Sequence, residues 1–192
     1  MFSLLRPAFV SIAFFTVLLG LAYPLAITGL ARLAPDQAGG SLVRSGGRIV
    51  GSALIGQAFT QPQYLHGRPS AAGYDASASS GSNLGPLNPD LAVRIAKSAA
   101  AIRAETGATA IPADAVTTSA SGLDPHISPA YAELQAGRIA AARGVPLDLV
   151  RAEIARHVEG RTFGVLGQPR VNVLETNLAL DAAFGRRQPP PQ

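Results

Sequence analysis

The chain of 192 residues contains no cysteine and no tryptophan, and only one methionine. The absence of cysteine excludes a disulfide framework, a thiol nucleophile and a metal site built from thiolates. Charge is also scarce, since 16 basic and 12 acidic residues make up 15% of the chain, against roughly 25% in a typical soluble domain. Scarce charge argues against a highly charged disordered protein and against a nucleic-acid partner. The length suits one domain of ordinary size.

The scarcity of charge has a local cause near the N-terminus. Residues 7–31 form a run of 25 without a charged side chain. A helix of that length would be about 37 Å long, enough to cross a hydrocarbon core of roughly 30 Å. We therefore predict a tail at 1–6 and a transmembrane helix at 7–31. A cleaved signal peptide is the alternative, although the apolar region of a signal is shorter. The flanking arginines do not settle on which side of the membrane the rest of the chain lies.

The remainder of the chain predicts a soluble domain. Residues 32–48 are rich in Gly, Ala and Ser and indicate a linker, the domain follows at 49–185, and a frayed tail is expected at 186–192. Cap residues, first-turn prolines and stop glycines predict helices at 88–107, 128–144 and 146–160 and a further helix from Asn172. Short strands are expected near 49–59 and 109–117. The predicted fold is a single N-terminal transmembrane helix plus one α+β soluble domain, helix-rich with a few short strands.

Between residues 60 and 90 the chain is dominated by Gly, Pro, Ser and Asn. A segment of this length without secondary structure is uncommon inside a compact domain, and is usually functional or disordered. Disorder usually comes with charge, whereas Arg68 and Asp75 are the only charged residues between 61 and 89. The side chains that could hold the segment in place are those of Tyr64, Leu65, Tyr74, Leu84 and Leu87. We therefore predict an ordered, packed loop.

Motifs that would carry catalysis are not found. Gly51 and Gly56 have the glycine spacing of a phosphate loop, but Gln57 stands where the phosphate-binding lysine is needed. The three histidines lie far apart in the sequence and lack clustered carboxylates, so no metal site is predicted. No catalytic residue is assigned, and nucleotide-binding residues stay unknown. A weaker hypothesis places an anion at the start of the helix after Ser128, beside His126.

Five unusual strings follow the apolar run in order: GSALIGQAF (51–59), GRPSA (67–71), YDASASSGSNLGPLNP (74–89), VTTSASGLDPHISPA (116–130) and LGQPRVNVLETNLALD (166–181). Together they resemble the KdpC family, the small subunits of the bacterial ATP-driven potassium pump KdpFABC. The resemblance extends from the apolar run to Asp181. It implies an assembly with KdpA, the potassium-conducting subunit, KdpB, the P-type ATPase, and KdpF, a small membrane peptide.

The resemblance also implies a function. The chain would be no enzyme by itself, but an accessory subunit of the bacterial inner membrane, with a periplasmic domain that acts as a catalytic chaperone and raises the ATP affinity of KdpB. No cofactor would be bound covalently, ATP would enter through KdpB, and potassium would be the ion that the complex transports. Because the ATP site of KdpB is cytoplasmic, a periplasmic domain could influence it only allosterically.

We expect the domain to lie near the mouth of KdpA, with the loop at 60–90 supplying much of the contact. The candidate partner-contact residues are Tyr64, Arg68, Tyr74, Asp75, Asn83, Asn88, Asp124 and His126. A bolder hypothesis has oxygen atoms of Asp75, Asn83 and Asn88 gather potassium, which prefers oxygen ligands. The alternatives are a membrane-anchored periplasmic hydrolase, using serines such as Ser80 and Ser121 with His126, and a ligand-binding module.

Overall fold

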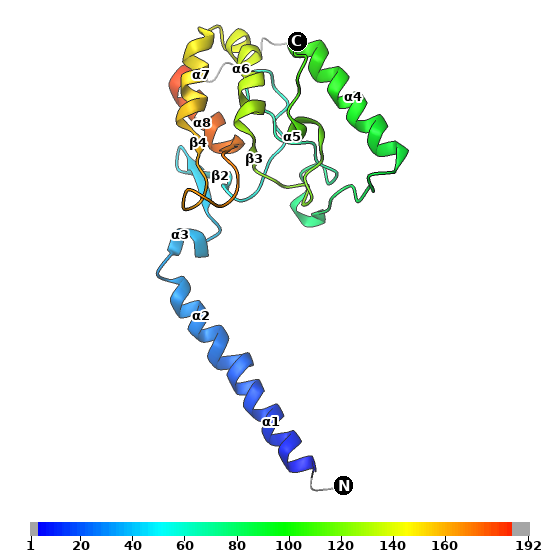
Figure 1. Cartoon of the computed structure of the whole chain (residues 1–192). Helices are drawn as coiled ribbons and strands as arrows, with labels where there is room; N and C mark the ends of the chain where they lie inside the picture. The colour runs from blue at the N-terminus through cyan, green and yellow to red at the C-terminus, as the bar shows by residue number, and fades with distance from the viewer. Residues whose placement is uncertain (1–3, 186–192) are drawn as a thin grey trace. The chain divides into compact units, whose positions relative to one another are not determined.

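The computed structural model describes residues 4–185 (Figure 1). It divides into two compact units, with the boundary between Leu42 and Val43. The predicted tail at 186–192 lies outside the described residues. Each unit is built by different means: the first is a single apolar helix with a short extension, and the second is a helix-rich α+β domain. The predicted fold class is therefore confirmed.

The first unit is dominated by one long apolar helix, Leu5–Ala31, with a mean hydropathy of 2.2 over its most apolar window. Its length and composition make it a candidate membrane span. It consists of α1 (Leu5–Val17), the π-helical turn η2 (Leu18–Ala22) and α2 (Tyr23–Ala31), and a single turn, α3 (Pro35–Ala38), follows. The helix thus begins two residues before the predicted span at 7–31.

Pro24 explains the π-helical turn. A proline inside a helix has no N–H to donate, and its ring clashes with the carbonyl four residues earlier. The wider turn at Leu18–Ala22 immediately precedes it, and the backbone N–H of Tyr23 donates to the carbonyl oxygen of Leu18. A π-bulge of this kind lets a helix continue past an obstruction. The Thr28 hydroxyl then donates to the Pro24 carbonyl oxygen at 2.7 Å.

The second unit contains two small sheets and five α-helices within the described residues. The helices are α4 (Pro89–Thr106), α5 (Ala113–Val116), α6 (Pro129–Arg143), α7 (Leu147–Arg156) and α8 (Val173–Phe184), with a 3-10 turn, η3, at Ala76–Ala78. Strands β1 (Leu42–Ser45) and β2 (Arg48–Ser52) form one sheet. Strands β3 (His126–Ile127), β4 (Val158–Glu159) and β5 (Arg170–Asn172) form the other, in the antiparallel order β3-β5-β4.

The capping residues predicted from the sequence set the helix ends. The side chain of Asn88 accepts from the backbone N–H of Asp90 at the start of α4. The side chain of Ser128 accepts from the backbone N–H of Tyr131 at the start of α6. The side chain of Asn172 accepts from the N–H of Glu175 at the start of α8. Gly107 and Gly144 end α4 and α6 in the left-handed conformation. These helices therefore form where local chemistry indicates.

Two predicted strands differ from the structure. The expected strand at 109–117 is wrong: Ala113–Val116 is the helical turn α5, whose Asp114 carboxylate accepts from both the N–H and the hydroxyl of Ser128. The expected strand at 49–59 is a strand only to Ser52. The predicted helix at 146–160 ends at Arg156, and Val158–Glu159 forms β4, which pairs with β5. The segment 32–48, predicted as a linker, contains α3 and β1 and the first residue of β2.

A compact core lies against α6. The buried side chains of α6 include Ala132, Ala136 and Ile139, and they pack with fully buried apolar residues from α7, β5, α8 and the loop after β2. Those residues are Val150, Val171, Leu180 and Leu65, all with 0% exposure. Figure 1 shows α6 and α7 lying beside each other, with α8 and β5 close by. The chain from 60 to 90 is therefore anchored in the core at its first part.

Candidate functional site: the paired loops and the Tyr64 pocket

The segment at Leu65 and His66 is held by side-chain amides in place of a neighbouring strand. The amide of Asn177, on α8, accepts from the Leu65 N–H at 2.7 Å and donates to the Leu65 carbonyl oxygen at 3.0 Å. The amide of Gln135, on α6, does the same for His66, at 2.8 and 3.1 Å. Both amides are buried. Because buried backbone groups need partners, these two side chains fix the path of the loop.

Arg143 is the second element that fixes this loop. It is the last residue of α6 and is only 4% exposed. Its guanidinium pairs with the Asp181 carboxylate at 2.9 Å and lies 5.3 Å from the centre of the Tyr64 ring. It also donates to the backbone carbonyl oxygens of Gln63, Leu180 and Gly185, at 2.9 to 3.1 Å. One buried side chain therefore joins the loop, α6 and the end of α8.

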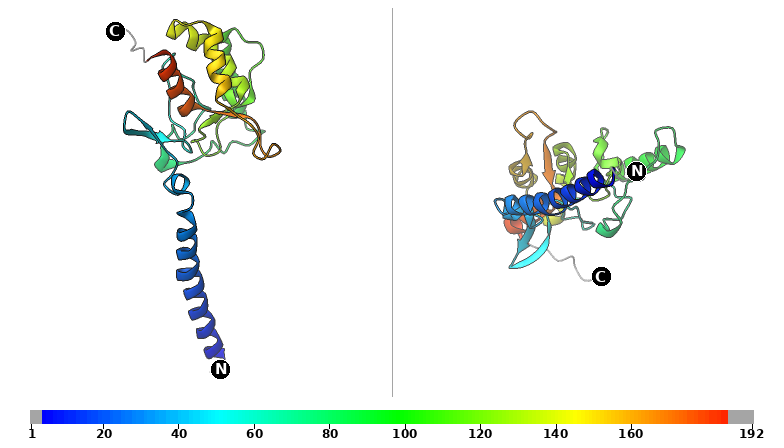
Figure 2. Two further views of the ribbon diagram at one scale, coloured as in Figure 1. Left: turned by 90° about the vertical axis from the view of Figure 1, so that its left-hand side faces the viewer. Right: turned by 90° about the horizontal axis from the view of Figure 1, so that it is seen from below.

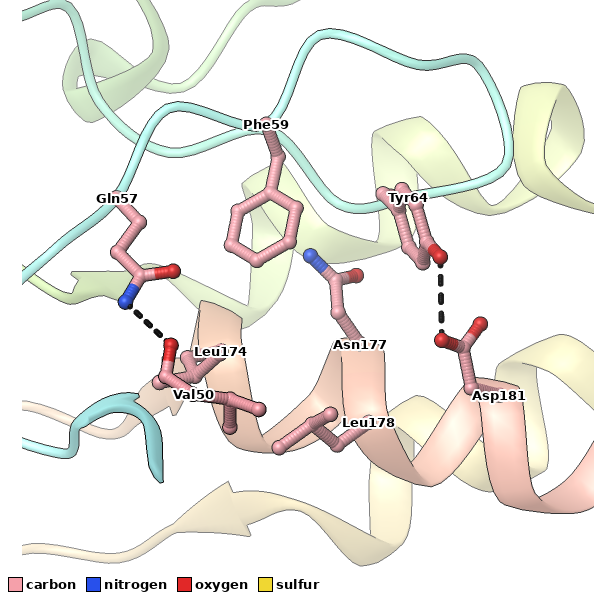
Figure 3. A pocket seen from close by; sticks show the side chains of 8 residues that line it. All are labelled: Val50, Gln57, Phe59, Tyr64, Leu174, Asn177, Leu178 and Asp181. Carbon is pink, nitrogen blue, oxygen red and sulfur yellow. Dashed lines mark hydrogen bonds between the residues drawn. The ribbon is translucent and has the colours of Figure 1, made fainter. Parts of the chain in front are cut away.

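A small cavity of about 180 Å³ lies between this loop and α8 (Figure 3). The Tyr64 hydroxyl donates to Asp181 at 3.1 Å at one end of it, and Gln57 donates to the Val50 carbonyl oxygen at 2.9 Å at the other. The other lining residues are Phe59, Leu174, Asn177 and Leu178. We call this cavity the Tyr64 pocket. Its volume is below the roughly 300–1,000 Å³ of sites for drug-sized ligands, so it suits a single small apolar group rather than a nucleotide.

Parts of three of the unusual strings, 67–71, 74–89 and 116–130, pack against each other. The Ser119 N–H donates to the Pro69 carbonyl oxygen at 3.0 Å, and the Ser70 hydroxyl donates to the Gly122 carbonyl oxygen at 2.6 Å. The segments 67–81 and 117–124 are called the paired loops below. A Cβ at Gly122 would lie 2.7 Å from the Ser80 carbonyl oxygen, and the φ of Gly122 is +70°. Glycine is therefore required there by both the close approach and the backbone conformation.

Four of the predicted partner-contact residues meet here, three within the paired loops and one next to them; we call Arg68, Tyr74, Asp124 and His126 the Arg68 cluster. Arg68 donates to Asp124 at 2.9 Å, and the Tyr74 hydroxyl donates to the Arg68 carbonyl oxygen at 2.7 Å. The Asp124 carboxylate also accepts from the backbone N–H of His126 at 3.0 Å. A cavity of about 500 Å³, which Asp114, Ser128 and Arg170 also line, opens beside this cluster. Burial raises the pKa of Tyr74, which keeps its hydroxyl a neutral donor.

The other predicted residues lie elsewhere. Asp75 accepts from the N–H and hydroxyl of Ser77 in the turn at η3, and Asn88 caps α4. Asn83 has a φ of +51°, a conformation that asparagine tolerates in turns. Tyr64 lines the Tyr64 pocket, where its hydroxyl donates to Asp181 and not to a residue of the Arg68 cluster. Leu87 is 96% exposed, so the expectation that it holds the loop in place is wrong.

Three important residues were missed by the sequence reasoning: Gln135, Arg143 and Asn177. The helical period offers a signal for the first two, because the buried face of α6 includes Ala132, Ala136 and Ile139, and Gln135 and Arg143 lie on it. A polar residue within a buried stripe must have a specific partner. The backbone groups that Gln135 and Arg143 bind lie in a loop about seventy to eighty positions earlier in the chain. The helical period gives no information about that loop.

The Asp124 carboxyl predicts a dependence of stability on pH. Burial raises its pKa, but hydrogen bonds from His126 and Arg68 and the charge of Arg68 outweigh burial, so its pKa lies below the ordinary 3.8. The carboxylate therefore stabilises the fold above pH 3.8, and this stabilisation is lost as the pH falls through the lower, folded-state pKa. We expect the melting temperature of the protein to exceed that of Asp124→Asn near pH 7, and the difference to shrink below pH 4. A difference that grows on acidification would contradict this.

Comparison with known proteins connects this geometry to a family. A family model described as "KdpC: K+-transporting ATPase, c chain" matches residues 5–182. The chain is 64% identical over 188 residues to the potassium-transporting ATPase KdpC subunit of Caulobacter vibrioides (strain NA1000 / CB15N), covering 96% of this chain and 95% of that one. It is 59% identical over 191 residues to that of Beijerinckia indica subsp. indica, covering 97% of each. The corresponding subunit of Myxococcus xanthus is 57% identical over 191 residues, covering 96% of this chain and 90% of that one. The match spans the apolar helix, the paired loops and the Tyr64 pocket, and the chain belongs to the KdpC family of K+-transporting ATPase c chains.

Proposed function

We propose that the chain is the non-catalytic accessory subunit of a potassium-transporting ATPase, assembled with KdpA, KdpB and KdpF in the bacterial inner membrane. The observation that carries the proposal is the family match over residues 5–182, which takes in the apolar helix and the domain together. The Leu5–Ala31 helix is the single-pass anchor, and the domain that follows is periplasmic. Family membership favours this role over the anchored hydrolase and the free ligand-binding module.

The proposed action on ATP is allosteric. A domain on the far side of the membrane can change the ATP affinity of KdpB only by binding one state of the pump better than another. Such discrimination favours a rigid contact surface, because loops that are already ordered lose little freedom on binding. The buried amides of Gln135 and Asn177 and the guanidinium of Arg143 supply this order to the loop after β2. The paired loops and the Arg68 cluster are the proposed surface near the mouth of KdpA.

Purified complex with and without this chain tests the proposal. We expect the KM for ATP of the potassium-stimulated ATPase to be lower in the presence of the chain, by about 5-fold or more, the lower end of typical couplings. Arg68→Ala, which removes the ion pair of the cluster, should raise the KM toward the value without the chain. Arg151→Ala, which removes an exposed ion pair of α7 with Glu133, is the matched control. An unchanged KM on omission of the chain would contradict the proposed effect on the ATP affinity of KdpB.

The absence of cysteine allows the orientation to be tested separately. A single cysteine introduced at Leu87, which is 96% exposed in the domain, should react with a membrane-impermeant maleimide added to intact spheroplasts. A cysteine introduced at Leu4, before the apolar helix, should react only after the membrane is opened. The reverse pattern would place the domain in the cytoplasm, and would leave the effect on KM to be explained by direct contact with KdpB.

A further inference from the structure

The loop between β4 and β5 ends in a closed, apolar tip. Thr162 and Leu166 face each other as an antiparallel pair, and each N–H donates to the other's carbonyl oxygen at 2.9 Å. The three residues between them, Phe163, Gly164 and Val165, form the turn. We call residues 162–166 the apolar tip. Because two backbone hydrogen bonds close it, the tip is a defined structure rather than a loose connection.

Phe163 has an unusual conformation that contributes no burial to the fold. Its φ is +53°, in the left-handed region that bulky side chains rarely adopt. Its side chain is 89% exposed, and those of Val165 and Leu166 are 70% and 59% exposed. Strained backbone conformations cluster at functional sites, and glycine would fit this position without strain. The domain thus presents a large apolar side chain at a cost to its own stability.

We propose that the apolar tip inserts into the surface of the lipid bilayer that holds the Leu5–Ala31 helix, as a second membrane contact. Three apolar side chains on a narrow turn fall well short of the roughly 800 Å² per partner that a standard protein interface buries. They suit insertion by about 5–10 Å into the boundary between headgroups and acyl chains. Arg161 precedes the tip and donates to the neutral Gln168, which leaves its charge for lipid phosphates.

The length of the connection keeps the bilayer within reach. Residues 32–41, ten in number, join the candidate membrane helix to β1, and ten extended residues span at most about 35 Å. The helical turn α3 shortens this further. Within the domain, the loop carrying the apolar tip and the β1–β2 hairpin both lie in the half opposite the connection between α6 and α7, and in Figure 2 they project on opposite sides of it. The tip therefore lies in the half of the domain at which the chain enters.

The absence of tryptophan makes a direct test possible, because a single introduced tryptophan is the only one in the chain. Phe163→Trp and, as a second probe, Val165→Trp are made in the full chain and reconstituted into bilayers containing phosphatidylglycerol. We expect their fluorescence to be quenched by lipids brominated near the headgroup and protected from aqueous iodide. The control is Leu149→Trp, on an exposed residue in the first turn of α7, which should be quenched by iodide alone. Tip probes that behave like this control would overturn the proposal.

The same probes in the assembled four-subunit complex, read as the difference from the complex that carries the unsubstituted chain, distinguish lipid from protein as the occupant. The proposal requires quenching by brominated lipid there as well. Protection from both iodide and brominated lipid would assign the tip to a partner subunit and overturn it. Phe163→Gly should raise the melting temperature of the domain, because it relieves the backbone strain, whereas a purely structural role of Phe163 would lower it. The Val165→Trp probe in the same chain should lose its quenching by brominated lipid.

Discussion

Replacing Arg143 with methionine is expected to destabilise the domain by about 3–5 kcal/mol, the usual cost of removing one partner from a buried ion pair. The Arg143 side chain is 1% exposed and the Asp181 side chain 10%, so the remaining carboxylate would be left with little solvent. The substitution also removes the donor to three backbone carbonyl oxygens. Methionine fills much of the volume, and the loss therefore reports polar contacts rather than a cavity.

Three further variants separate the causes of this loss. Arg143→Lys keeps the charge but lacks the planar guanidinium with its several N–H donors. Its free energy of unfolding should therefore lie between those of the unsubstituted protein and Arg143→Met. Asp181→Asn in the Arg143→Met background removes the buried charge that has lost its ion-pair partner, and should recover part of the stability. Arg151→Met, at an ion pair with both partners 49% exposed, should cost less than about 1 kcal/mol. The measurement is denaturant unfolding of the full chain in detergent, and a loss below 1 kcal/mol for Arg143→Met would contradict the argument.

Local chemistry accounts for the part of the fold that the sequence predicts well. Asn88, Ser128 and Asn172 all cap helices as expected, because a cap depends on residues within one turn. The prediction of a strand at 109–117 is wrong because a contact between residues distant in the sequence decides the structure there. The helical turn α5 is fixed by the contact of Asp114 with Ser128, which lies fourteen positions later. The hairpin β1–β2 turns at Gly46–Gly47, both with positive φ. Two adjacent glycines favour such a turn, but they lie within the segment 32–48, whose composition predicts a linker.

The candidate site shows the same division between local and distant causes. Arg68, Tyr74, Asp124 and His126 come together because the three unusual strings that contain them, 67–71, 74–89 and 116–130, meet at the paired loops. The unusual composition of those strings identified them, although it did not indicate which contacts each residue makes. Asp75 and Asn88 share that composition but serve only their own turns. Composition therefore locates a loop-rich surface, and long-range pairing decides which of its residues form a cluster.

Asn177→Leu is expected to destabilise the domain by about 2–6 kcal/mol, because it leaves the buried N–H and carbonyl oxygen of Leu65 without partners, at about 1–3 kcal/mol for each group. Asn177 is 2% exposed and Leu65 is 0% exposed, so water cannot replace the lost hydrogen bonds without opening the core. The backbone amides of Leu65 and His66 should lose hydrogen-exchange protection before those of α6. Asn88→Ala, which removes an asparagine that caps α4, should cost about 1 kcal/mol and leave the protection of Leu65 unchanged.

Asn177→Asp tests the directions of these two hydrogen bonds. A carboxylate keeps the acceptor for the Leu65 N–H, but it loses the donor to the Leu65 carbonyl oxygen and adds a buried charge. The variant should therefore be at least as unstable as Asn177→Leu at pH 7. Burial raises the pKa of such a carboxyl, and the protonated form can donate again, so the deficit relative to the protein should shrink as the pH falls from 7 toward 5. A deficit that stays constant over this range would show that the amide does not donate to Leu65, and that the loop is fixed by Gln135 and Arg143 alone.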